Sequence, residues 1–124
     1  MQIIFLLGRL MYAALFIESG IGHVTKTKQM GAYAKSNGVP AAEFMTFLTG
    51  IMILVGAISV IFDFMIFYGA LLILLFLVPT AFMMHAFWKV QDPGMRQMQH
   101  IQFMKNISLA GAALMIMFFS SGVH

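Results

Sequence analysis

The sequence has no cysteine and very little charge. Without a thiol, the chain offers no cysteine nucleophile, no disulfide exchange, no Cys-ligated zinc and no iron–sulfur cluster, so redox chemistry would have to come from a bound molecule or a partner. Charged residues make up 9% of the 124 residues and apolar residues 61%, whereas soluble domains carry roughly 25% charge. A chain this short cannot bury that much apolar surface within itself, so we expect a membrane protein. The composition excludes collagen, disordered tails, nucleic-acid binders and secreted disulfide scaffolds.

Four apolar stretches are long enough to cross a membrane, since about 30 Å of hydrocarbon takes roughly 20 helical residues. One helix through the second and third stretches would be a rod about 60 Å long, so Asp63, which interrupts them, predicts a tight turn. The fold class is therefore all-α, an integral membrane bundle of four transmembrane helices in a single domain. This domain covers residues 1–124, with spans at about 3–22, 44–62, 64–85 and 101–122.

The two longer connections between these spans are polar. In the first, Gly38 can end a short interfacial helix and Pro40 can open the second span. In the second, Asp92-Pro93-Gly94 predicts a break before a polar run at residues 95–99.

Basic residues gather on one side of the predicted bundle. Four spans place both longer connections on that side, and the other side has only the Asp63 turn and two nearly uncharged termini. The positive-inside rule then predicts an inner-membrane protein with both termini in the periplasm. The six basic residues on the predicted cytoplasmic side are Lys26, Lys28, Lys35, Lys89, Arg96 and Lys105.

Two ionisable residues in the first span, Arg9 and Glu18, need partners, because a lone charge in a bilayer costs several kcal/mol. They cannot pair with each other on a straight helix, since they lie about 13 Å apart on opposite faces. Arg9 can reach the membrane edge or the carbonyls freed by Pro79, or it can bind a substrate. Its role stays open, with structural neutralisation as the simpler reading.

Glu18 lies at the depth at which Lys105 enters the fourth span, near His85 at the end of the third. We therefore expect a Glu18–Lys105 ion pair between the first and fourth helices, with His85 in the same network. Such a pair could fix helix register or face a ligand, and the sequence leaves both open. The candidate polar cluster thus comprises Arg9, Glu18, His85, Lys105 and Asn106.

Histidines near one interface raise the possibility of a metal or haem. No two lie at paired mid-span positions with carboxylates beside them, so we expect no metal site and no covalently bound cofactor. His23, Trp88 and His100 are interpreted as interfacial residues, with Trp88 and His85 on one helical face.

Small residues predict where helices approach closely. Ser108, Gly111 and Ala112 recur at i, i+3 and i+4 and predict a flat contact face on the fourth span. Gly50 and Gly56 predict a similar face on the second.

The order of several short motifs resembles the DoxX family. These are Gly8-Arg9-Leu10, the run Phe16 to His23, Gly38-Val39-Pro40, His85-Ala86-Phe87-Trp88, and Gln102 to Asn106 followed by Gly111. Members of that family are four-helix bacterial inner-membrane proteins, and related DoxD proteins are membrane subunits of a thiosulfate:quinone oxidoreductase. The resemblance therefore implies a redox-associated role in the membrane, with quinone as the candidate cofactor.

The sequence departs from the family pattern at two positions. An acidic residue that is frequent in the second span is Ile53 here, and the usual Lys after the first span is His23. With Glu18 as the remaining intramembrane acid, a proton relay through two carboxylates is in doubt.

Two functions follow from this reasoning. The first is a quinone-interacting redox subunit that works with a partner oxidoreductase. The second is a non-catalytic accessory subunit that docks a larger membrane complex. In both, the partners are the lipid bilayer and either a membrane protein complex or further copies of the chain; the sequence leaves open whether it is an enzyme.

Overall fold

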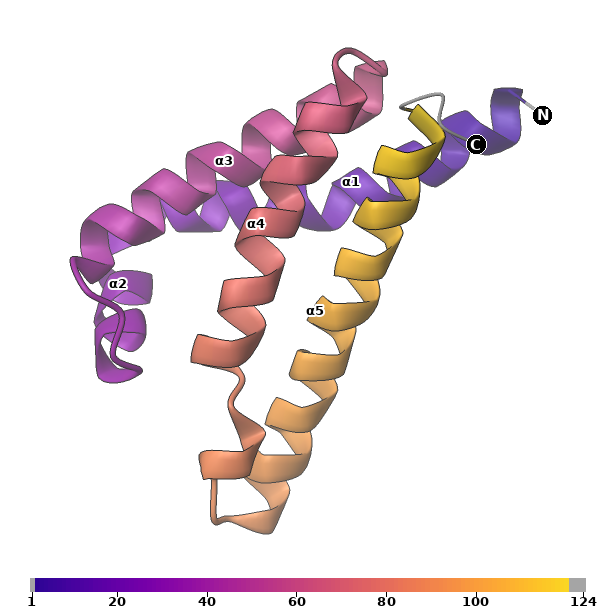
Figure 1. The fold of residues 1–124 in the computed structure, drawn as a ribbon. Coiled ribbons are helices and arrows are strands. Elements are labelled where there is room, and N and C mark those ends of the chain that lie inside the picture. The colour runs from indigo at the N-terminus through magenta and orange to yellow at the C-terminus, as the bar shows by residue number, and fades with distance from the viewer. Residues whose placement is uncertain (1, 121–124) are drawn as a thin grey trace.

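The computed structural model describes residues 2–120, which fold into five α-helices and one short 3-10 helix (Figure 1). Four of the helices are long and apolar enough to cross a membrane. The all-α, four-span fold with a short helix between the first two spans is therefore confirmed. The elements are α1 (Gln2–Thr25), α2 (Thr27–Ser36), α3 (Ala42–Phe62), α4 (Ile66–Met84), η1 (Phe87–Lys89) and α5 (Pro93–Ser120).

The long helices form two pairs. Helix α1 packs along α3, helix α4 packs along α5, and the two pairs are joined by contacts between α3 and α4. Figure 1 shows the pairs meeting near the Asp63 turn and spreading apart toward α2 and η1. The buried apolar core lies where they meet, and Phe16, Ile53 and Ile73 are among its largest side chains.

Glycines allow the close approaches between these helices. A Cβ atom on Gly50 would lie 2.7 Å from the Cβ of His23, and one on Gly56 would lie 2.7 Å from the carbonyl oxygen of Gly69. Neither contact is sterically acceptable, so glycine permits α1 to pack on α3 and α3 to pack on α4 at these points. The expectation for Gly50 and Gly56 is confirmed.

The contact face predicted for the fourth span, Ser108, Gly111 and Ala112, is wrong. The face that α5 buries lies elsewhere around the helix axis. A Cβ on Gly111 would meet no atom within 4 Å, and Ser108 is exposed. The face that α5 buries instead carries Asn106, Ala110 and Ala113, at i, i+4 and i+7. Both sets of residues have the spacing of a helix contact face. The packing of α5 against α4 buries the second set.

We expect opposite effects from adding one methyl group at two glycines. Gly56→Ala should destabilise the protein by about 1–3 kcal/mol, because the new Cβ meets backbone of α4 that cannot move aside cheaply. Gly111→Ala should be neutral or stabilising by up to about 1 kcal/mol, because its Cβ enters open space and alanine favours the helix. Thermal unfolding of both variants in detergent tests this difference, and equal melting temperatures would contradict the packing described.

Two turns position the last two helices. Asp63 adopts a left-handed conformation, with φ 54°, and Phe64 N–H donates to the Ser59 carbonyl, so the predicted turn is present. At the second turn the Asp92 carboxylate accepts from Met95 N–H at 2.9 Å, and Pro93 is the first residue of α5. Helix α5 therefore begins at Pro93 and not at 101, which makes the polar run part of the last span. Its predicted end at 122 lies outside the described residues.

Candidate functional site

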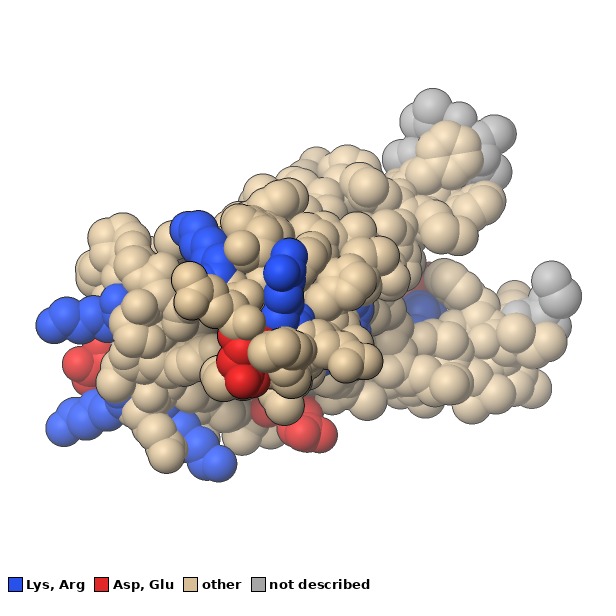
Figure 2. Space-filling view, turned by 90° about the horizontal axis from the view of Figure 1, so that it is seen from below, with Lys and Arg blue, Asp and Glu red and all other residues tan. Residues whose placement is uncertain are grey.

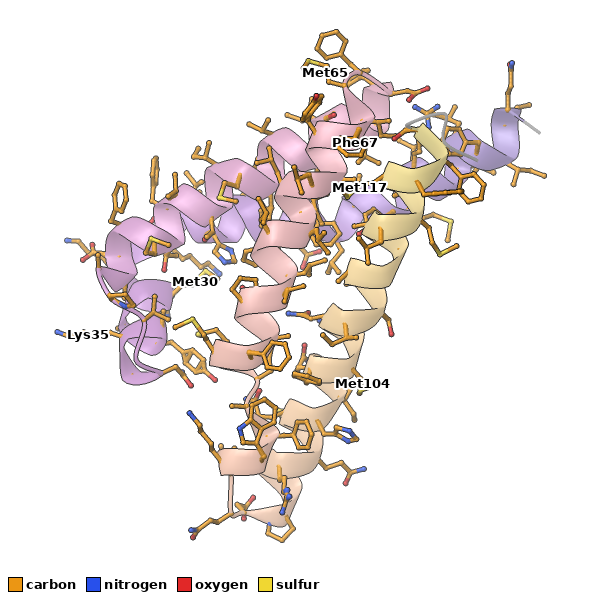
Figure 3. The ribbon with its side chains drawn as sticks, in the orientation of Figure 1. Met30, Lys35, Met65, Phe67, Met104 and Met117 are labelled. Atoms are coloured by element: carbon orange, nitrogen blue, oxygen red, sulfur yellow. The ribbon has the colours of Figure 1, made fainter. Side chains whose placement is uncertain are left out.

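A cleft of about 640 Å³ lies where the two helix pairs spread apart. Helices α1, α2, α3, α4 and α5 all contribute to its wall, which is mainly apolar. Met30 faces it from α2, whereas Lys35 points outward from the opposite side of that helix (Figure 3). The polar side chains of its lining are Ser19, His23, Gln29, Tyr33, Thr46, Thr49, Thr80, His85, Gln102, Lys105 and Asn106.

Two polar contacts mark the ends of this cleft along α5. At the outer end, the Gln99 amide donates to the Tyr33 hydroxyl of α2 at 3.5 Å. At the inner end, the Tyr12 hydroxyl of α1 donates to the Leu109 carbonyl at 2.6 Å. The α5 residues that line the cleft run from Gln102 to Leu109, so the cleft extends about 10 Å along α5.

Both cleft histidines are held by their Nδ1 atoms. His23 Nδ1 donates to the Ser19 carbonyl at 2.7 Å, and His85 Nδ1 donates to the Gln99 amide oxygen at 2.8 Å. Because each acceptor is a carbonyl-type oxygen, the proton lies on Nδ1 in the neutral ring and Nε2 is the basic nitrogen. Each imidazole therefore has a fixed orientation and a nitrogen that can accept or return a proton.

Lys105 and Asn106 reach the cleft without partners of their own. Asn106 is only 6% exposed, and neither side chain has a hydrogen bond or ion pair with any residue of the described chain. With Gln102 and Leu109, they occupy positions i, i+3, i+4 and i+7 of α5, which form one helical face. That spacing is visible in the sequence and could have identified Gln102 as a further cleft residue.

The structure does not bring Glu18 and Lys105 together, so the predicted ion pair is not formed. Glu18 is exposed on α1 outside the cleft and has no hydrogen-bond or ion-pair partner within residues 2–120. Ser19, its neighbour, is the residue that turns toward the cleft. The prediction assumed a closed bundle, whereas residues of both α1 and α5 line the cleft and Glu18 lies outside it.

Arg9 lies at the opposite end of the molecule from the cleft residues His85, Lys105 and Asn106. Its Nη1 donates to the Ile61 carbonyl at 3.0 Å and lies 3.5 Å from the Val60 carbonyl, while the guanidinium stacks 4.8 Å from the Phe5 ring centre. Both carbonyls belong to the last turn of α3, where the usual helical donors four residues on are missing and a cation is favoured, and the Val60 carbonyl also accepts from Asp63 N–H at 3.4 Å. Arg9 thus caps α3, and the carbonyls it uses are those of α3 and not those near Pro79.

We expect Arg9→Ala to destabilise the protein by about 1–3 kcal/mol, because two carbonyls at the end of α3 lose a charged donor. The matched control is Arg96→Ala, since Arg96 is exposed in the polar start of α5. Melting temperatures in the same detergent check the result. An Arg9→Ala variant as stable as Arg96→Ala would contradict the capping role.

Trp88 and His100 lie in an aromatic cluster between η1 and α5. Their ring centres lie 5.5 Å from Phe103 and 4.4 Å from Phe87, respectively. Trp88 and His85 do not share a helical face, because α4 ends at Met84 and the chain enters η1 between them. Within the described part of the chain, no three His, Asp or Glu side chains converge into a metal-binding group.

Charge is distributed unevenly over the molecule. Seen from the end that carries α2 and η1, the Lys and Arg side chains gather on that end (Figure 2). The cleft residues Tyr33 and His85 lie toward this end, where Gln99 contacts both.

These features define a multi-pass membrane protein with an apolar cleft near its basic end. The family model described as DoxX matches residues 4–86, more than half of the sequence, and the chain belongs to the DoxX family. No curated protein and no solved structure matches the chain. The match covers α1 to α4, so the resemblance from Gln102 to Asn106 and at Gly111 stays a prediction.

The two departures from the family pattern have different surroundings. Ile53 is completely buried in the core between the helices, and His23 lines the cleft. Neither position 53 nor Glu18 therefore presents a carboxylate to the cleft.

Proposed function

We propose that the chain is an inner-membrane subunit that binds a quinone in the cleft and works with a partner oxidoreductase. The family supports a redox-associated role in the membrane. The volume of about 640 Å³ lies within the range of roughly 300–1,000 Å³ found for small-molecule sites. The observation that carries the proposal is Asn106, a carboxamide that is 6% exposed, faces an apolar cleft and has no partner in residues 2–120.

The lining residues fit a quinone ring. The ring needs an apolar slot and donors for its oxygens, and Asn106 can donate to one oxygen while His85 Nε2 can exchange a proton at another. A bound quinone supplies two-electron, two-proton chemistry, with the electrons coming from the partner. The His85 ring is oriented by Gln99 near the opening, where protons can reach water.

Quinone retention tests this function. The protein is purified from native membranes in mild detergent, extracted with organic solvent and assayed for quinone by mass spectrometry. We expect quinone to co-purify with the wild-type chain. The amount that co-purifies with Asn106→Leu should be at least ~10-fold lower, because the donor in the cleft is lost. Gln97→Leu, an exposed position on the same helix, should retain it. Absence of quinone from the wild-type protein would contradict the function.

An accessory role in a membrane complex is the second candidate, and Glu18 is the observation that favours it. A carboxylate within a membrane span that is exposed and has no partner among residues 2–120 calls for a cation or donor from a neighbouring protein. On this reading Glu18→Leu should reduce the size of the native complex on a gel of solubilised membranes. Turnover per assembled complex should stay unchanged.

The proposed function includes a membrane orientation. With the basic end in the cytoplasm and both termini in the periplasm, the cleft opens toward the cytoplasm. Protons taken up or released at His85 would then exchange with that side.

A further inference from the structure

Helix α5 presents a polar face to the cleft, which consists of Gln102, Lys105 and Asn106. None of the three has a hydrogen-bond or ion-pair partner in the described part of the chain. The face lies between the Gln99–Tyr33 contact at the opening and the Tyr12–Leu109 contact at the inner end. It therefore faces the space that a bound molecule would fill.

The cleft has a positive charge and no negative one to balance it. Lys105 is the charged member of its lining, and no Asp or Glu is present among the described residues that form the wall. The acid at the nearest depth, Glu18, lies outside the cleft. Lys105 is exposed at the cleft and Asn106 is 6% exposed, so the empty site offers an exposed lysine beside a carboxamide that has no partner in the described part of the chain.

An anionic oxygen is the ligand feature that would satisfy both groups. A hydrogen bond from a charged donor to an anionic oxygen is roughly twice as strong as one between neutral groups. Lys105 can supply that charged donor, and the Asn106 amide can donate to a second oxygen beside it. A neutral ring would satisfy Asn106 and leave Lys105 without a counterion.

We propose that the polar face of α5 selects quinones in an anionic form, with a ring oxygen that has lost its proton paired with Lys105 and a neighbouring ring oxygen accepting from Asn106. This inference rests on the proposed function, because it names the chemical form of the quinone that the same cleft binds. It adds a discriminating residue, Lys105, in the part of the chain beyond the segment that matches the family. The proposal concerns binding alone and involves no electron transfer.

Two synthetic probes test it. One is a 2-hydroxy-3-alkyl-1,4-naphthoquinone, which is an anion at mildly alkaline pH, and the other is its 2-methoxy ether, which has the same ring and tail but cannot ionise. Binding to the purified full-length protein in detergent is measured by absorbance titration. We expect the wild-type chain to bind the anion about 10-fold more tightly than the ether, as an added charge-assisted hydrogen bond predicts.

Three variants separate the contributions of the groups. Lys105→Met should make the Kd values of the two probes nearly equal, mainly because binding of the anion becomes weaker. Asn106→Leu should weaken the binding of both probes, since both carry a ring oxygen that can accept a hydrogen bond from the amide. Lys89→Met is the matched control, because Lys89 is an exposed lysine of η1 outside the cleft lining, and it should keep the wild-type preference.

The outcomes are distinguishable from failure of the proposed function. If neither probe binds the wild-type protein, quinone binding itself fails. If both bind with equal affinity, or if Lys105→Met keeps the preference, selection of the anion by Lys105 is wrong while quinone binding stands. Palmitate provides the last comparison: tighter binding of this fatty acid than of the hydroxynaphthoquinone would overturn assignment of the site to a quinone oxygen.

Discussion

Replacing Thr80 by tryptophan should remove quinone binding, with an increase in Kd of at least about 100-fold, or ~2.7 kcal/mol. Thr80 lies on α4, is half-buried, and lines the cleft with no hydrogen bond to any described residue. An indole at this position would project into the space that a quinone ring needs. The measurement is titration with the naphthoquinone probes, accompanied by circular dichroism to establish that helix content is kept.

The same substitution on the outer face of α4 provides the control. Val78 is exposed and lies outside the cleft lining, so Val78→Trp should present the indole to lipid and leave Kd within about twofold of the wild type. If Thr80→Trp binds as tightly as Val78→Trp, the ligand occupies some other site and the cleft has no role in binding. If both lose binding while keeping helix content, the effect is one of tryptophan on α4 in general.

The helices could be predicted from the sequence because their lengths follow from bilayer thickness. The Asp63 turn follows for the same reason, since an uninterrupted helix through it would be far too long for the bilayer. The start of the last span was predicted at residue 101 and lies at Pro93, although the sequence contains the signal for it. Asp92 followed by Pro93 is a typical helix N-terminus, in which the carboxylate accepts a backbone N–H and proline occupies the first turn.

The candidate site was only partly predictable, because depth along a helix says nothing about how far two helices diverge. Glu18 and Lys105 were matched by depth, but the two helix pairs are separated there, so Lys105 lines the cleft and Glu18 lies outside it. His85, Lys105 and Asn106 do come together at the cleft, as members of the predicted cluster. The partners of His85 and Arg9 depend on tertiary packing: Gln99 lies 14 residues from His85, and Ile61 lies 52 residues from Arg9.

The predicted membrane orientation has an all-or-none consequence for the activity of reporter fusions. Alkaline phosphatase is active only after export, so a fusion after His124 should be fully active if the C-terminus is periplasmic. A fusion after Gly38, in the connection between α2 and α3, should be inactive. The physical reason is the accumulation of Lys and Arg at the end that carries α2 and η1, which favours retention of that end in the cytoplasm (Figure 2).

Neutralising three lysines tests the cause of this orientation. Lys26, Lys28 and Lys35 are exposed or lie on the outer surface near α2, so replacing all three by glutamine should reduce the bias without disturbing the core. The fusion after His124 should then lose part of its phosphatase activity as a fraction of the chains inserts in the opposite orientation. An inactive fusion after His124 in the unaltered chain would instead place the opening of the cleft in the periplasm. His85, bonded to Gln99 near that opening, would then exchange protons with the outer side, which reverses the side from which protons are taken up during quinone reduction.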